Sequence, residues 1–134
     1  MTVLLDTHVW LWWLLGSDRL PARERGALDR LASRAGLRVA AVSLWEAQML
    51  HAKHRLLLDR SFDVWIREAA ATVEVVPLDI EVVIALDGLP ASFHGDPADR
   101  LIVATARAHR IPLATHDQTI RRSRAAHVWK PRTA

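Results

Sequence analysis

The alternation of short apolar runs with longer helix-like segments constrains the fold of this chain most strongly. Four apolar runs with the character of buried strands occur at residues 2–5, 37–43, 73–78 and 111–115. Two helix-like segments separate each run from the next. Strands joined through helical crossovers pair in parallel, whereas tight hairpins join antiparallel strands. The pattern therefore predicts an α/β fold with a mostly parallel central sheet and helices on both of its faces.

Capping signals predict where two of the helices begin. Ser43 and Glu46 match the S-x-x-E capping box, so we expect Ser43 to cap the helix that follows it. Asp96 precedes Pro97, which predicts a helix entered with Asp96 as the cap. A last short strand is expected at residues 127–129.

Length and composition indicate one compact domain over residues 1–134. The absence of cysteine excludes disulfides, thiolate zinc sites and a cysteine nucleophile. The apolar run at residues 9–15 is too short to span a bilayer, and no basic residue precedes it as in a signal peptide. We therefore expect a cytoplasmic protein that does not interact with membranes.

Positive charge gathers in the last third of the chain. The formal net charge is +3, but from Arg100 onward eight basic residues accompany a single acid, Asp117. A basic segment of this kind suits a polyanionic partner such as nucleic acid, although a solvated face is the simpler explanation. We expect a nucleic-acid-binding face at Arg121, Arg122 and Arg124.

Acidic residues fall where a parallel sheet places its ligand sites. Asp6 follows the first strand and Asp117 follows the fourth, while Glu46 and Asp99 are expected in the first turns of their helices. Ligand sites in open parallel sheets form outside the carboxyl ends of the strands. We therefore expect these four carboxylates to meet at one edge of the sheet.

A cluster of carboxylates at one edge requires protons or a cation to offset its repulsion. Oxygen ligands favour Mg²⁺ or Mn²⁺, and Mg²⁺ commonly binds a few carboxylates together with substrate phosphates. Each acid also has a structural explanation: Glu46 in a capping box, Asp99 beside a helix dipole and Asp117 as a helix cap. Asp96 is a further candidate ligand, although its role as a cap is favoured. Three histidines close to the acids are expected in surface or supporting roles: His8, His94 and His116.

Four segments in order across nearly the whole chain resemble one protein family. They are LLDTHVWLWWL (4–14), SLWEAQML (43–50), DPADRLIVATA (96–106) and PLATHD (112–117). Together they resemble the PIN domain, and specifically the small PIN-domain toxins of the VapC type. The resemblance implies a three-layer α/β/α fold, Mg²⁺- or Mn²⁺-dependent ribonuclease activity, a cognate antitoxin and a homodimer.

The resemblance also implies roles for individual residues. The family's four acids fall on Asp6, Glu46, Asp99 and Asp117, and its two site hydroxyls on Thr7 and Thr115. For Arg100 two roles remain open, a structural ion pair or a contact with the scissile phosphate. The alternative to a ribonuclease is a non-catalytic PIN-like module that binds nucleic acid or protein.

Overall fold

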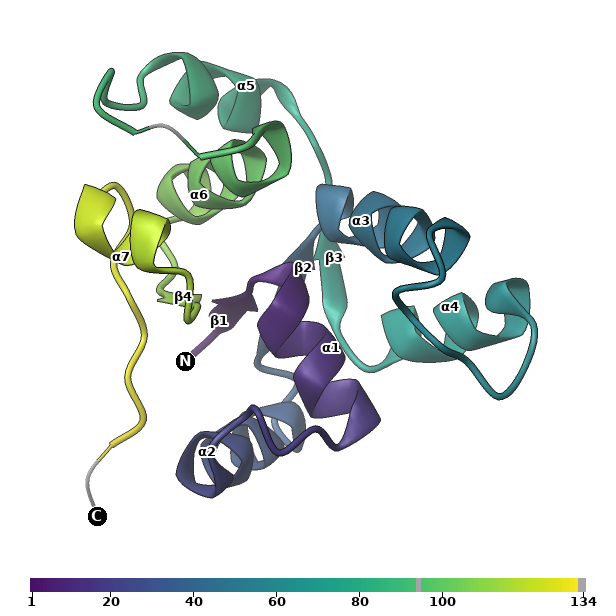
Figure 1. Ribbon diagram of the computed structural model, residues 1–134. Helices are drawn as coiled ribbons and strands as arrows, with labels where there is room; N and C mark the ends of the chain where they lie inside the picture. The colour runs from purple at the N-terminus through teal and green to yellow at the C-terminus, as the bar shows by residue number, and fades with distance from the viewer. Residues whose placement is uncertain (94, 133–134) are drawn as a thin grey trace.

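The central sheet has four strands, all parallel, in the order β3-β2-β1-β4. The computed structural model describes residues 1–93 and 95–132, so the expectation for His94 lies outside it. Figure 1 shows the strands at the centre of the molecule with helices around them. The strands are β1 (Val3–Leu5), β2 (Leu37–Ala40), β3 (Glu74–Val76) and β4 (Leu113–Ala114). The prediction of a mostly parallel sheet is confirmed.

Seven helices within the described residues cover the sheet. They are α1 (Thr7–Leu15), α2 (Ala22–Ala32), α3 (Ala41–Ala52), α4 (Phe62–Ala71), α5 (Ile80–Asp87), α6 (Pro97–His109) and α7 (Gln118–Ser123). Helices α1 to α4 contribute to the hydrophobic cluster on one face of the sheet, while α6 and α7 contribute to the cluster on the other. Helix α5 packs against α6. In the described part of the chain, no helix combines the length and the apolar character that crossing a bilayer requires.

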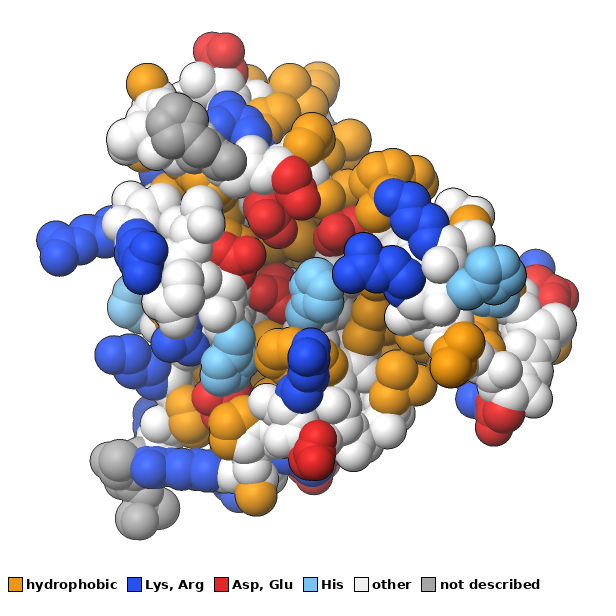
Figure 2. All heavy atoms as spheres, viewed as in Figure 1, with side chains coloured by type: hydrophobic (Ala, Val, Ile, Leu, Met, Phe, Trp, Pro, Cys, Tyr) orange, Lys and Arg blue, Asp and Glu red, His pale blue; other side chains and the backbone are white. Residues whose placement is uncertain are grey.

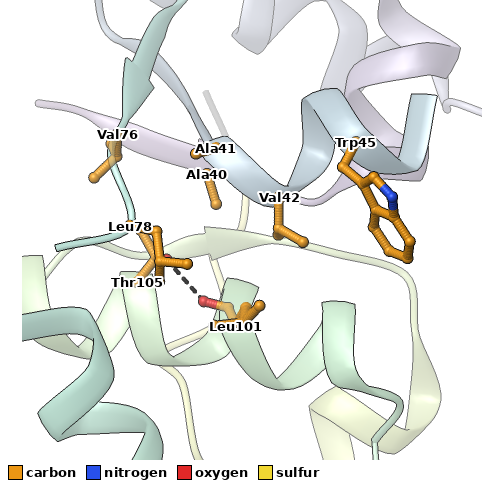
Figure 3. Close-up of a pocket in the computed structure, with 8 residues that line it drawn as sticks. All are labelled: Ala40, Ala41, Val42, Trp45, Val76, Leu78, Leu101 and Thr105. Atoms are coloured by element: carbon orange, nitrogen blue, oxygen red, sulfur yellow. Dashed lines mark hydrogen bonds between the residues drawn. The ribbon is translucent and has the colours of Figure 1, made fainter. Parts of the chain in front are cut away.

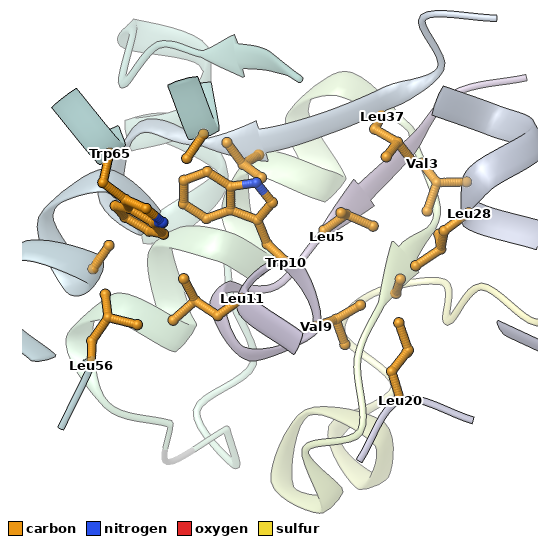
Figure 4. Packing of buried hydrophobic residues seen from close by; sticks show 14 residues of the cluster. Val3, Leu5, Val9, Trp10, Leu11, Leu20, Leu28, Leu37, Leu56 and Trp65 are labelled. Atoms are coloured by element: carbon orange, nitrogen blue, oxygen red, sulfur yellow. The ribbon is translucent and has the colours of Figure 1, made fainter. Parts of the chain in front are cut away.

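Strand β1 supplies side chains to both layers of the core. Val3 and Leu5 point into the cluster that contains Trp10 (Figure 4). Leu4 belongs to the opposite cluster, together with Ile102. All three β1 side chains have no exposed surface. Alternation along a strand sends successive side chains to opposite faces, so an uninterrupted apolar run indicates a strand buried on both sides. This explains the three-layer arrangement.

The predicted capping box at Ser43 is wrong. Helix α3 already begins at Ala41, with Ala40 as its N-cap and no side-chain capping bond. Alanine has the highest helix propensity, so the helix starts inside the apolar run instead of at the serine. Ser43 is fully buried within α3, and Glu46 consequently lies in the second turn.

The expected strand at residues 127–129 is reduced to a single parallel bridge between Leu113 and Val128. Two backbone bonds of 2.8 Å support it, from Leu113 N to His127 O and from Trp129 N to Leu113 O. Pro112 precedes the two-residue β4 and Pro131 follows the bridge, and proline has no N–H with which to extend a ladder.

Two glycines should respond to alanine in opposite directions. A Cβ at Gly36, just before β2, would lie 2.8 Å from the carbonyl oxygen of Met1, so Gly36→Ala should lower the free energy of unfolding. A Cβ at Gly26, inside α2, would meet only Arg30 Nη1 at 3.6 Å. Gly26→Ala should therefore raise that free energy by about 0.5–1 kcal/mol. Urea denaturation of both variants measures this, and a stabilised Gly36→Ala would contradict the packing described.

Candidate active site

Asp6 and Asp117 lie at the carboxyl ends of adjacent strands, and each caps the helix that follows. Asp6 Oδ1 accepts a hydrogen bond of 2.8 Å from Val9 N at the start of α1. Asp117 Oδ1 accepts one of 2.9 Å from Ile120 N at the start of α7. The pairing of β1 with β4 places these caps side by side, because Asp6 N donates to Ala114 O at 3.0 Å.

Two threonine hydroxyls hold the acidic side chains. Thr115 Oγ1 donates to Asp6 Oδ2 and accepts a bond of 3.0 Å from Asp117 N, so one buried hydroxyl links two of the acids. Thr7 Oγ1 donates to Glu46 Oε1 in the same way. Both threonines therefore act by orienting carboxylates.

Ser43 contacts the candidate site, although its sequence pattern predicted a helix cap. Its hydroxyl lies 2.8 Å from Thr7 Oγ1, which in turn binds Glu46. The available signal was a polar residue within an otherwise apolar stretch, but the capping-box pattern explained that residue in a different way.

Asp96 and Asp99 lie together at the start of α6 with different local roles. Asp96 is the N-cap, as predicted, and its Oδ1 accepts a bond of 2.8 Å from Asp99 N. Its side chain is exposed, whereas Asp99 is half-buried in the first turn. Glu46, from α3, is buried.

Burial and mutual repulsion raise the pKa values of three of these carboxyl groups. Burial is the main cause for Asp99, whose pKa rises to about 7 with further contributions from the charges of Asp96, Asp117, Glu46 and Asp6. Burial also raises the pKa of Asp6, against the opposing hydrogen bonds from Thr115 and Val9. Burial likewise raises the pKa of Glu46, although its bond from Thr7 acts in the other direction. The charges of these acids therefore interact with one another, which is consistent with their lying close together.

Figure 2 shows acidic side chains gathered in a hollow at the centre of one face. Within the described residues, no group of three or more His, Asp or Glu side chains is arranged to hold a metal ion as it stands. The donor set nevertheless fits a hard divalent cation, since it consists of carboxylate oxygens whose clustered charge needs compensation. The residues able to contribute are Asp6, Glu46, Asp99 and Asp117.

The basic residues near the acids make structural contacts. Arg100 Nη1 donates to Phe93 O at 3.0 Å, a contact outside both roles considered for it. Arg121 donates from Nε and Nη2 to Thr115 O, at 3.0 and 2.8 Å, and so secures the residue between two acids. His116 Nε2 lies 2.6 Å from Glu24 Oε2, which ties α2 to the segment before Asp117.

The contribution of Asp99 to the stability of the metal-free protein should fall as pH rises from about 4 to about 7. Asp99 has a raised folded-state pKa, so the folded state binds more protons than the unfolded state in this window and loses stability as they dissociate. Asp99→Asn should flatten this decline, because the amide does not ionise. Melting temperatures in chelator across this range test the prediction, with the exposed Asp87→Asn as the control. An equally steep decline in Asp99→Asn would contradict it.

Comparison with known proteins identifies the family of the chain. The PIN domain model matches residues 3–125. The chain is 38% identical over 131 residues to Ribonuclease VapC22 of Mycobacterium tuberculosis, covering 96% of this chain and 98% of that protein. The fold is similar to a chain in the crystal structure of DNA-bound VapBC from Salmonella typhimurium, with a TM-score of 0.75, 15% identity and coverage of 96% and 97%. It is also similar to one in that of FitAcB from Neisseria gonorrhoeae, with a TM-score of 0.69, 21% identity and coverage of 97% and 98%. The chain belongs to the PIN-domain family, and within it to the VapC type.

Proposed function

We propose that this protein is a metal-dependent endoribonuclease that hydrolyses RNA phosphodiester bonds as the toxin of a type II toxin–antitoxin pair. The convergence of Asp6, Glu46, Asp99 and Asp117 on one sheet edge, with three raised pKa values, is the observation that carries the proposal. The relative with 38% identity is named a ribonuclease, which supports the same reaction class.

Mg²⁺ or Mn²⁺ is the proposed cofactor, held by Asp6, Asp99 and Asp117, with Glu46 as a further ligand or as the group that orients water. Such an ion, when bound, lowers the pKa of a coordinated water and polarises phosphoryl oxygens. Asp96 is assigned to the helix cap, since its Oδ1 is engaged with Asp99 N.

The protein's own residues prepare this edge for a charged substrate. Thr115 and Thr7 fix the orientation of Asp6 and Glu46, so these carboxylates need little reorganisation when a cation arrives. Arg122 and Arg124 are exposed on and just after α7, next to Asp117, and suit contacts with RNA phosphates. Arg121 belongs to the same basic face but also holds Thr115.

The proposed protein partner is a cognate antitoxin in the cytoplasm. The similar solved structures are of VapBC and of FitAcB, and they supply the analogy. Charge compensation at the acidic edge by an antitoxin would also relieve the repulsion among the carboxylates.

We further propose that a second copy of the chain covers an apolar surface formed by exposed residues of α5 and by the hollow beside Leu78 and Trp45. Ile80, Val83 and Ile84 of α5 are 76%, 51% and 60% exposed. They continue from Leu78, which with Trp45 lines an apolar hollow of about 250 Å³ (Figure 3). The exposed apolar side chains of α5 lie beside this apolar hollow, so the same surface on two copies could form the self-complementary contact of a two-fold dimer.

Cleavage of a structured RNA by the purified protein tests the proposed activity. Cleavage should require Mg²⁺ or Mn²⁺, stop with EDTA and return when the ion is restored in excess. Binding of RNA without cleavage under any divalent ion would favour the alternative, a non-catalytic PIN-like module.

Asparagine at Asp99 and at Asp96 should separate the metal site from the helix cap. Asp99→Asn should lose activity at ordinary Mg²⁺ concentrations, because an amide lacks the formal charge that a hard cation favours. Asp96→Asn should retain stability and much of the activity, since asparagine caps a helix about as well as aspartate. Asp96→Ala should instead cost about 1 kcal/mol of stability.

Cleavage rate against Mg²⁺ concentration, together with melting curves of these variants, provides the measurement. If Asp96→Asn is as inactive as Asp99→Asn, then Asp96 belongs to the metal site.

Ile84→Glu should convert the proposed dimer into a monomer, because it places a charge within the apolar surface. Val64→Glu is the control, since Val64 is also exposed (42%) but lies on α4, outside this surface. Light scattering after size-exclusion chromatography gives the mass. A dimer that persists in Ile84→Glu would place the interface elsewhere.

A further inference from the structure

The edge of the sheet opposite the acids carries two hollows lined by basic residues. Met1, Gly36 and Pro112 mark this amino edge, since Val3 N bonds to Gly36 O and Leu4 N to Pro112 O. The first, the α2 hollow, has a volume of about 340 Å³ and is lined by Met1, Ala27, Arg30, Leu31, Arg34, Trp129 and Arg132. The second, the α6 hollow, also has about 340 Å³ and is lined by Ala106, Arg107, Arg110, Ile111, Pro112, Ala126 and His127.

The charge in these hollows is uncompensated by acidic side chains. Within residues 1–93 and 95–132, no acidic residue lines either hollow, and none of their arginines belongs to an ion pair. Arg107 Nη1 donates to Ala125 O at 3.2 Å. The α2 hollow thus brings three guanidinium groups together without a carboxylate among its lining residues.

Helix dipoles account for only part of this pattern. Arg30 lies in the last turn of α2 and Arg107 in the last turn of α6, where cations are favoured. Arg132 and His127 belong to the C-terminal segment, outside any helix, so the dipole gives no reason for them. Arg34 lies in the turn after α2, two residues past its last residue, and lines the hollow together with Arg30. A ligand that carries negative charge explains the whole set.

We propose that this amino edge is a second binding surface for the single-stranded RNA substrate, centred on the α2 hollow. Guanidinium groups suit phosphates, and Trp129 supplies an aromatic surface of the kind on which bases stack. Figure 2 shows Lys and Arg side chains along the side of the molecule from α7 to the C-terminal segment, a path between the acidic hollow and the amino edge. The inference rests on the proposed function for RNA as the substrate class.

The test uses binding without cleavage, measured by fluorescence polarisation of a labelled, mixed-sequence single-stranded RNA in EDTA. The double variant Arg30→Gln/Arg34→Gln should bind several-fold more weakly than the wild type. On a single strand, each phosphate contact contributes about 0.7 to the slope of log K against log salt concentration. Loss of two contacts should therefore reduce the magnitude of this slope by about 1.4. Arg19→Gln/Arg67→Gln is the matched control, because both arginines are exposed and line neither hollow. The control should match the wild type.

Equal affinity and salt slope in both double variants would overturn the proposal. So would polyglutamate competing as well as unlabelled RNA of equal charge, since that result would assign the surface to an acidic peptide. Melting curves check that both double variants remain folded.

Cleavage assays distinguish a failure of this proposal from a failure of the proposed function. In Arg30→Gln/Arg34→Gln, KM for a long RNA should rise while cleavage of an RNA dinucleotide, too short to reach both edges, stays unchanged. A wild type that cleaves neither substrate, yet binds RNA more tightly than the variant, would refute the nuclease and support the amino-edge surface. Active cleavage with an unchanged KM in the variant would do the reverse.

Discussion

The parallel pairing of β1 with both of its neighbours is the constraint on which the rest of the structure depends. β1 has only three residues, all fully buried, and its register with β2 and β4 aligns the ends of these strands. Asp6 follows this strand directly, and Thr115 follows β4 beside it. Because the hydroxyl of Thr115 donates a hydrogen bond to Asp6 Oδ2, the backbone register of the two strands determines how the Asp6 carboxylate is oriented.

The acidic edge is costly for the folded chain and suited to a charged ligand. Burial and like charges raise the pKa values of Asp6, Glu46 and Asp99, which means that ionising them opposes folding. An electrostatic cost of this kind at a functional site is a common compromise between stability and activity. The surrounding hydrogen bonds from Thr7 and Thr115 offset part of the cost and fix the orientation of the Glu46 and Asp6 carboxylates.

The two edges of the sheet carry charges of opposite sign. Acids gather at the carboxyl edge, where helices begin with aspartate caps at Asp6 and Asp117. Arginines gather at the amino edge, where α2 and α6 end. This separation agrees with the dipoles of helices that run antiparallel to the strands. A polyanion attracted to the basic surfaces would therefore meet the acidic hollow only where a cation makes this favourable.

The sequence by itself determined the class of fold, because the alternation of apolar runs and helical segments leaves few topologies. It also determined which acids follow strands, and the cap at Asp96 was predicted from its local pattern with Pro97. Tertiary structure decided the rest, since hydrogen bonds between distant residues are not encoded in local spacing. The contact of Ser43 with Thr7 replaced a predicted capping box, Arg100 binds the carbonyl of Phe93, and Arg121 holds Thr115. The basic α2 hollow at the amino edge likewise depends on folding. Packing brings α2 next to the C-terminal segment, about a hundred residues later in the chain, and so places the arginines of both together.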